Sequence, residues 1–255
     1  MAWNVGAGLE GKGVLVTGAA GGIGKSVAEA FGATGARVMA VDLDQGAVEA
    51  VVAGLPGGGH LAVGANLRDL GALTGLVGRA RQELGSLDVL VHLAAVLRRR
   101  LNIDEVTEED WDFQIDLNFK STFFLARAAA GAMRDQGRGG RVILFSSQGW
   151  WTGGLGGSVV YNAAKGGVVT MARGLSRIYG PHGITVNTVA PSFVITPMLM
   201  SGLDPTMLES WKTATPLGRL ADPGEIAGPV VFLASDHASF ISGTTLNISG
   251  GFLNY

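Results

Sequence analysis

Short apolar runs alternate with longer segments of helical periodicity along most of the chain. The runs are rich in valine and leucine and have few polar positions, which is typical of parallel strands that helices cover on both faces. Strands are predicted at 13–17, 37–42, 61–64, 87–91, 141–145, 185–189 and 244–248. The alternation predicts an α/β fold built on a doubly wound parallel sheet of about seven strands.

The segments between these runs place their apolar residues at the three- to four-residue spacing of helices. Helices are predicted at 23–34, 70–84, 107–133 and 159–179, and a further helix begins near 222–225. Thr107 and the three acids that follow it are a favourable helix start. Residues 198–212 are expected to be irregular or helical. No abrupt change in composition divides the chain, so we expect one domain over 1–255.

The charge and composition exclude several classes of function. A formal net charge of -2 disfavours a nucleic-acid partner. The absence of cysteine excludes disulfides and thiolate metal sites, and the four histidines are too scattered to suggest a metal site. We see no secretory signal and no apolar run long enough to cross a bilayer. We therefore expect a soluble, cytoplasmic protein without a metal or a membrane partner.

A glycine-rich turn, Thr17-Gly18-Ala19-Ala20-Gly21-Gly22-Ile23-Gly24, joins the first predicted strand to the first predicted helix. Glycines in this position let the backbone approach a pyrophosphate at the positive helix N-terminus. The candidate contacts are Gly18, Gly22, Ile23 and Gly24. Taken by itself, the motif is also compatible with an ordinary tight turn.

Asp42 ends the second predicted strand, 18 residues after Gly24. An acid at about this interval accepts hydrogen bonds from the adenosine ribose hydroxyls of NAD. Its charge would repel the 2′-phosphate of NADP, so NAD is the expected cofactor. A solvated residue at the strand end is the alternative.

Tyr161 has a lysine, Lys165, one helical turn later, which places both side chains on one helix face. A nearby ammonium favours phenolate and would bring the pKa of the tyrosine towards neutrality. Without other groups, such a pair is more often an exposed helix pair than an active site. Ser147 follows the fifth predicted strand, where it can hydrogen-bond a substrate oxygen. Asn118 lies in an apolar helix stretch and is either the holder of a proton-relay water or a satisfied buried amide.

Together these motifs resemble the short-chain dehydrogenase/reductase family, in its ordinary one-domain form, over nearly the whole chain. The family's glycine pattern matches 17–24, and its Asn, Ser, Tyr and Lys match Asn118, Ser147, Tyr161 and Lys165. The resemblance implies a Rossmann-like strand order of 3-2-1-4-5-6-7 and a homotetramer.

The resemblance also implies roles for these residues. Tyr161 would exchange a proton with the substrate oxygen while the nicotinamide exchanges hydride. Lys165 would lower the pKa of the tyrosine and bind the nicotinamide ribose. Ser147 would orient the substrate oxygen, and Asn118 would support a water relay.

Further cofactor contacts are implied by the resemblance at Leu43, Asn66, Leu67, Ala94, Pro191, Val194 and Thr196. The chain departs from the family after the fourth strand, where His92-Leu93-Ala94-Ala95 replaces the usual Asn-Asn-Ala-Gly. We expect His92 to be a packed replacement for the asparagine, since a lone histidine on a buried strand is usually structural.

Three other sequence features lie outside the motifs that carry this resemblance. Trp150 and Trp151 either form an aromatic wall over the substrate or pack in the core. A methionine-rich segment that includes Trp211 is expected to cover the substrate; its methionines are Met198, Met200 and Met207. The run Arg98-Arg99-Arg100 can attract an anionic substrate or carrier, although a solvated loop or a subunit contact is the favoured interpretation.

The sequence therefore predicts an NAD(H)-dependent oxidoreductase that interconverts a secondary alcohol and a ketone, with polyols, sugars or cyclic alcohols as candidate substrates. The first alternative is a 3-oxoacyl thioester reductase, which would use NADPH. A noncatalytic nucleotide-binding scaffold is the alternative of another class.

Overall fold

The computed structural model describes residues 6–154, 156–200 and 205–254. Its seven strands form one parallel sheet in the order β3-β2-β1-β4-β5-β6-β7, which confirms the predicted topology. The strands are β1 (Gly13–Thr17), β2 (Arg37–Asp42), β3 (Leu61–Gly64), β4 (Val89–His92), β5 (Gly140–Phe145), β6 (Ile184–Pro191) and β7 (Thr245–Ile248).

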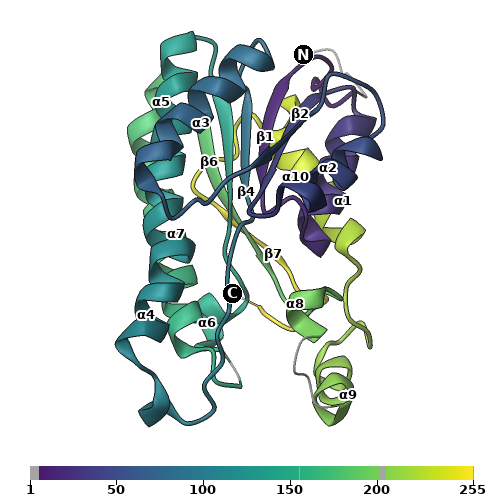
Figure 1. Cartoon of the computed structure of the whole chain (residues 1–255). Coiled ribbons are helices and arrows are strands. Elements are labelled where there is room, and N and C mark those ends of the chain that lie inside the picture. Colours follow the sequence, from purple (N-terminus) through teal and green to yellow (C-terminus); the bar gives the residue numbers. More distant parts are fainter. Residues whose placement is uncertain (1–5, 155, 201–204, 255) are drawn as a thin grey trace.

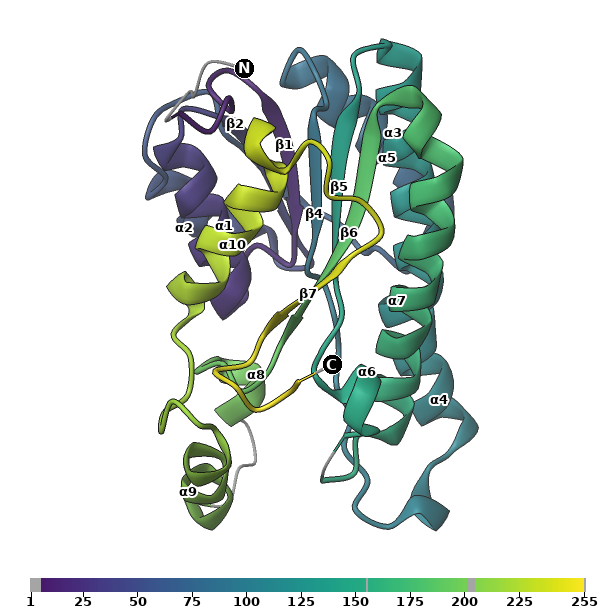
Figure 2. The ribbon, with the colours of Figure 1, turned by 180° about the vertical axis from the view of Figure 1, so that it is seen from behind.

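Helices cover both faces of the sheet (Figures 1 and 2). One face packs against α1 (Gly22–Ala33), α2 (Gln45–Ala53) and α10 (Pro223–Ala234). The other face packs against α3 (Leu70–Glu83), α5 (Thr122–Gln136) and α7 (Val159–Tyr179). Each face has its own apolar core cluster, as expected for strands buried on both sides. Among the described residues, no helix has both the length and the apolar character needed to cross a membrane.

Several shorter elements were not predicted from the sequence. The nine-residue helix α2 buries Val48 and Val51, but this is too short a segment to display a convincing helical period. The four-residue helix α6 (Gly149–Thr152) follows β5. The segment expected to be irregular or helical contains α8 (Pro197–Met200) and α9 (Pro205–Ala214). Short 3-10 turns are η1 (Ile103–Glu105), η3 (Gly180–His182) and η4 (Asp236–Ala238).

The predicted continuous helix at 107–133 is interrupted, and this prediction was therefore wrong in detail. Thr107 caps α4 (Glu108–Ile115) through a reciprocal capping box with Asp110, as its sequence suggests. A wider π-helical turn, η2 (Asp116–Ser121), then separates α4 from α5. Such turns are frequent at functional sites, and this one contains the buried side chain of Asn118.

Candidate active site

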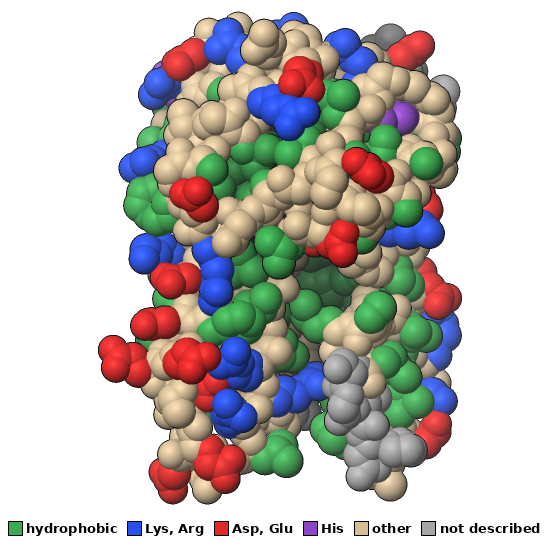
Figure 3. Space-filling view, viewed as in Figure 1, with side chains coloured by type: hydrophobic (Ala, Val, Ile, Leu, Met, Phe, Trp, Pro, Cys, Tyr) green, Lys and Arg blue, Asp and Glu red, His purple; other side chains and the backbone are tan. Residues whose placement is uncertain are grey.

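A cavity of about 360 Å³ opens at the carboxyl ends of the central strands. Its walls come from the segments that follow β1, β4, β5 and β6, from the start of α7, and from α8 and α9. The space-filling view shows a hollow lined largely by hydrophobic side chains, with Lys and Arg side chains near its margin (Figure 3). This is the edge at which open α/β sheets bind ligands.

The glycine-rich turn forms one wall of this cavity, and two of its glycines have no room for a side chain. Gly18 has a φ of +71°, and a Cβ atom there would lie 2.7 Å from the backbone nitrogen of Ala94. A Cβ on Gly24 would lie 2.0 Å from the carbonyl oxygen of Gly18. No side chain caps α1, and its first residues, Gly22 to Gly24, line the cavity. An uncapped helix start behind a glycine turn fits the phosphates of a nucleotide.

Asp42 lies beside this turn, at the carboxyl end of β2. Its Oδ2 accepts a hydrogen bond from the Ala20 nitrogen at 2.9 Å, and its Oδ1 accepts one from the Leu43 nitrogen at 2.7 Å. The carboxylate therefore ties the glycine turn to the second strand. Asp42 is half-buried and does not belong to the described lining of the cavity.

Ser147, Tyr161 and Lys165 line the same cavity as the glycine turn. Lys165 is only 3% exposed, and its Nζ donates a hydrogen bond to the carbonyl oxygen of Phe145 at 2.8 Å. The same Nζ lies 5.5 Å from the centroid of the Tyr161 ring. The structure thus brings together three of the four residues predicted to be catalytic.

Burial dominates the electrostatics of Tyr161. Burial raises the pKa of Tyr161 to about 12, and a hydrogen bond with Ser147 and the charge of Arg99 only partly oppose this rise. Burial also lowers the pKa of Lys165 to about 8. Burial is thus the largest influence on the pKa of Tyr161, and the effect of Lys165 on that pKa stays a prediction.

The fourth predicted residue, Asn118, is a satisfied buried amide. Its Oδ1 accepts a hydrogen bond from the Val96 nitrogen at 2.9 Å, and its Nδ2 donates one to the Val96 oxygen at 2.8 Å. The amide therefore holds the segment after β4 against the π-helical turn η2. The structure shows the second of the two alternatives for this side chain, and a role in a water relay stays a prediction.

His92 is buried at the end of β4 between two threonines. Its Nδ1 lies 2.7 Å from the Thr17 hydroxyl and its Nε2 lies 3.0 Å from the Thr122 hydroxyl. Burial, and secondly the charge of Lys165, lower the pKa of His92 to about 3. The Thr122 hydroxyl donates its hydrogen to the Asn118 carbonyl, so it accepts from Nε2 while Thr17 donates to Nδ1. This neutral, satisfied imidazole is a packing residue.

The other predicted cofactor residues divide into two groups. Pro191, Val194 and Thr196 line the cavity together with the glycine turn, and Ala94 packs against Gly18. The remaining three do not belong to the described lining: Leu43 and Asn66 are exposed, and Leu67 is buried in the core.

Only some of the aromatic and methionine residues that were candidates for covering the substrate line the cavity. Trp150 and Trp151 pack against each other, with ring centroids 5.3 Å apart, but neither belongs to the described lining of the cavity. An aromatic wall made by these two residues is therefore not seen. Met198 and Trp211 do line the cavity, and the Trp211 ring stacks on Phe193 at 4.7 Å. The segment of α8 and α9 thus supplies the apolar cover.

Sequence reasoning also missed several lining residues, including Leu97, Phe145, Gln148 and Asn162. Arg99 was considered, but a solvated loop or a subunit contact was favoured for it, whereas the structure places it in the cavity wall. The alternation of residues along an extended segment is the signal that predicts which of the three arginines faces inward.

The family of the chain follows from comparison with known proteins. Residues 18–253 match the family model described as enoyl-(acyl carrier protein) reductase. D-threitol dehydrogenase of Mycolicibacterium smegmatis is 37% identical over 246 residues, which cover 96% of this chain and 94% of the relative. The 3-oxoacyl-(acyl-carrier-protein) reductase of Escherichia coli is 37% identical over 243 residues, covering 95% of this chain and 98% of the relative.

A solved structure titled short-chain dehydrogenase/reductase, glucose/ribitol dehydrogenase, from Brucella melitensis has a TM-score of 0.90 at 32% identity. The match covers 98% of this chain and 100% of that chain. The chain belongs to the short-chain dehydrogenase/reductase family. It is an oxidoreductase of a family that uses a nicotinamide cofactor and acts on small molecules.

Proposed function

We propose that the protein is an NAD(H)-dependent oxidoreductase that interconverts a secondary alcohol and a ketone. The observation that carries this proposal is that Tyr161, Ser147 and Lys165 line the same cavity as the glycine-rich turn. A proton-transfer group and a phosphate-binding turn in one cavity are what hydride exchange at a carbinol carbon requires. Oxidation of the alcohol would release one proton and pass one hydride to the cofactor.

Each of the three residues has a separate task in this proposal. Tyr161 transfers the proton to or from the substrate oxygen, and Ser147 holds that oxygen by a hydrogen bond. Lys165 stabilises the phenolate form of Tyr161 and binds ribose hydroxyls of the cofactor. When bound, the nicotinamide supplies or accepts the hydride. Asn118 is a positioning residue in the same proposal, because its amide fixes the segment that forms the cavity wall after β4.

Asp42 supports NAD as the cofactor. Its carboxylate lies at the end of β2 and is oriented by the backbone nitrogens of Ala20 and Leu43. A fixed negative charge at this position favours ribose hydroxyls and repels a 2′-phosphate. The neighbouring turn residues Gly18 to Gly22 contribute no cation that would offset this charge.

Replacement of Tyr161 tests the catalytic part of the proposal. Tyr161→Phe removes the acid/base hydroxyl, so kcat on a secondary alcohol should fall by about 100-fold or more while NADH binds almost as before. Tyr179→Phe is the matched control on the same helix, since the Tyr179 hydroxyl donates to the Arg127 carbonyl, away from the cavity. Retention of wild-type turnover by Tyr161→Phe would rule out the assigned mechanism.

Titration with NADH and NADPH tests the cofactor part. The wild-type protein should bind NADH more tightly, and Asp42→Asn should narrow that preference by about tenfold by removing the charge. Asp69→Asn is the control, because Asp69 is an exposed acid that caps α3. Tighter binding of NADPH by the wild-type protein would contradict the role of Asp42.

A 3-oxoacyl thioester reductase is the second candidate, supported by the Escherichia coli relative at 37% identity. It differs from the first in predicting preference for NADPH and turnover of a 3-oxoacyl thioester. A noncatalytic scaffold would bind the cofactor without turnover of any alcohol or ketone. The two titrations and a substrate panel separate the three candidates.

A further inference from the structure

The segment after β4 runs along the cavity in an alternating pattern. Its odd-numbered residues, Leu93, Ala95, Leu97 and Arg99, all line the cavity. Successive side chains of an extended segment point to opposite sides, so this alternation is the expected consequence of an extended conformation. Arg99 is therefore the member of the arginine run that belongs to the cavity wall.

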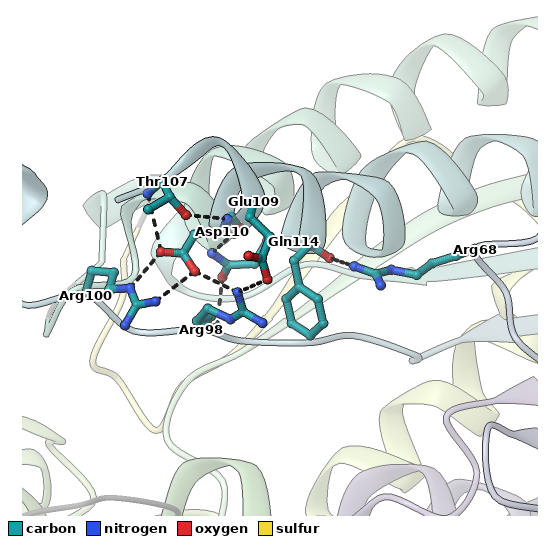
Figure 4. A network of polar contacts seen from close by, with 8 residues as sticks. Arg68, Arg98, Arg100, Thr107, Glu109, Asp110 and Gln114 are labelled. Atoms are coloured by element: carbon teal, nitrogen blue, oxygen red, sulfur yellow. Dashed lines mark hydrogen bonds and ion pairs between the residues drawn. The ribbon is translucent and has the colours of Figure 1, made fainter. Parts of the chain in front are cut away.

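The two flanking arginines bind on the opposite side, at the start of α4. Arg98 Nη1 lies 2.8 Å from Asp110 Oδ1, and Arg100 Nε lies 2.7 Å from Asp110 Oδ2. Figure 4 shows both guanidinium groups directed at this carboxylate. The side chain of Asp110 is 1% exposed, and these contacts hold the pKa of its carboxyl well below the ordinary value. Arg98 Nη1 also lies 3.2 Å from Glu109 Oε1, so two carboxylates face the two guanidinium groups.

Backbone contacts hold the same segment in place on both sides of Arg99. The nitrogen of Arg98 donates to Gln114 Oε1 at 3.1 Å, and that of Arg100 donates to the Gly157 carbonyl at 3.0 Å. Gln114 is itself buried on α4. With its neighbours fixed in this way, Arg99 is presented to the cavity by a segment that needs little reorganisation on ligand binding.

The cavity wall is positively charged around Arg99. Among the described residues that line it, Arg99 and Lys165 are cationic and no side chain is acidic. The ammonium of Lys165 already donates to the Phe145 carbonyl. The charge of Arg99 also lowers the pKa of the Tyr161 phenol, so the guanidinium acts on the group that exchanges the proton.

We infer that Arg99 selects substrates that carry a carboxylate close to the reacting carbinol or carbonyl carbon, that is, hydroxy acids and their oxo acids. This inference rests on the proposed function and names its substrate class. A guanidinium binds a carboxylate with two parallel hydrogen bonds, and one cation matches a monoanion. A cavity of about 360 Å³ that also admits part of the cofactor leaves room for a small acid.

Matched pairs of acids and alcohols test this selection: glycerate with glycerol, threonate with threitol, and gluconate with glucitol. Kinetics with NAD should give the wild-type protein a higher kcat/KM on an acid than on its alcohol. Arg99→Gln should lower kcat/KM for the acid by about 10-fold to 100-fold, mainly through KM, because a charge-assisted hydrogen bond is lost. Because the charge of Arg99 also acts on Tyr161, kcat/KM for the alcohol should fall as well, but by less, so the ratio of kcat/KM for the acid to that for the alcohol should fall by about tenfold. Arg99→Lys keeps the positive charge but cannot form two parallel hydrogen bonds, so its kcat/KM for the acid should lie between those of the wild-type protein and Arg99→Gln.

Arg81→Gln is the matched control, because Arg81 is an exposed arginine on α3, outside the cavity wall. Calorimetric titration of the NADH-saturated protein with threonate and with threitol gives a binding measurement that does not need turnover. Tighter binding of threonate in the wild-type protein, lost in Arg99→Gln and kept in Arg81→Gln, is the expected result.

The inference is wrong if no acid binds more tightly or reacts faster than its alcohol, or if Arg99→Gln affects both compounds equally. It is also wrong if glycerol 3-phosphate is preferred over glycerate, because the anion recognised is then a phosphate. The proposed function stands in these cases as long as alcohol turnover is lost in Tyr161→Phe. It fails separately if that variant keeps wild-type turnover.

Discussion

The two walls of the cavity are constructed in different ways. The wall that we propose binds the cofactor, here called the cofactor wall, depends on backbone: Gly18 and Gly24 leave no space for a Cβ, and Asp42 fixes the turn through main-chain nitrogens. The wall that we propose contacts the substrate, here called the substrate wall, consists of side chains from separate segments, among them Leu97, Arg99, Met198 and Trp211. A wall made of backbone cannot change without disturbing the fold, whereas a wall made of side chains can vary its specificity on a constant scaffold.

The largest effect that this comparison predicts is at Gly24. Gly24→Ala places a Cβ 2.0 Å from the Gly18 carbonyl oxygen, so the turn must move. We expect a loss of about 3 kcal/mol in the free energy of unfolding and a loss of NADH binding of tenfold or more. Chemical denaturation and cofactor titration measure the two.

Gly78→Ala on α3 is the matched control for this substitution. It is also a helical glycine, but a Cβ there meets nothing within 4 Å. This variant should gain about 0.5 to 1 kcal/mol because alanine has the higher helix propensity. Equal effects of the two variants would contradict the steric explanation.

The next effect concerns Lys165, which also lines the cavity. Its pKa in the folded protein is about 8, below the ordinary value of 10.5, so the unfolded chain holds the proton between these values. Raising the pH from 8 to 10 therefore favours the folded state, by about 2 to 3 kcal/mol. Denaturation of the wild-type protein and of Lys165→Met, compared at each pH, isolates this contribution. A difference independent of pH would show that the buried lysine is not depressed in pKa.

A smaller effect is expected at Asp110, which forms ion pairs with Arg98 and Arg100, the two residues that flank Arg99. Asp110→Asn should weaken both arginine contacts and raise KM for an acid by about tenfold, with kcat and NADH binding nearly unchanged. The pKa of the Asp110 carboxyl is lowered by the two arginines, so its stabilising effect is present above pH 3.8 and is lost as the pH falls towards the lower folded value. The difference in Tm between wild type and variant should shrink below pH 3.8. An increase in KM for alcohols as large as that for acids would contradict a role through Arg99.

The smallest effect on stability is expected at Met198, in the cover of the substrate wall. Its side chain is 43% exposed, so Met198→Ala should change the free energy of unfolding by less than about 0.5 kcal/mol. Because Met198 lines the cavity, KM values for different substrates should nevertheless change relative to one another. A stability loss as large as that of Gly24→Ala would remove the distinction between the two walls.

Local sequence patterns determined the architecture and much of the cofactor wall. Buried parallel strands have continuous apolar runs, and a glycine turn before a helix has a fixed spacing, so both are visible along the chain. The strand order and the positions of Ser147, Tyr161 and Lys165 in one cavity agree with the sequence-based predictions. The amphipathic period of 107–133 also predicted the helices there, although it gave no sign of the π-helical turn around Asn118.

Only the tertiary structure decided the partners of these side chains. The Asn118 amide hydrogen-bonds to the backbone of Val96, 22 residues away in the chain. Arg98 and Arg100 form ion pairs with two acids of α4, Glu109 and Asp110. Burial raises the pKa of Tyr161, and Ser147 and Arg99, both distant from it in the sequence, partly oppose that rise. Burial and contacts between distant segments set these properties, because solvation and charge act through space, whereas sequence periodicity reports only what is near along the chain.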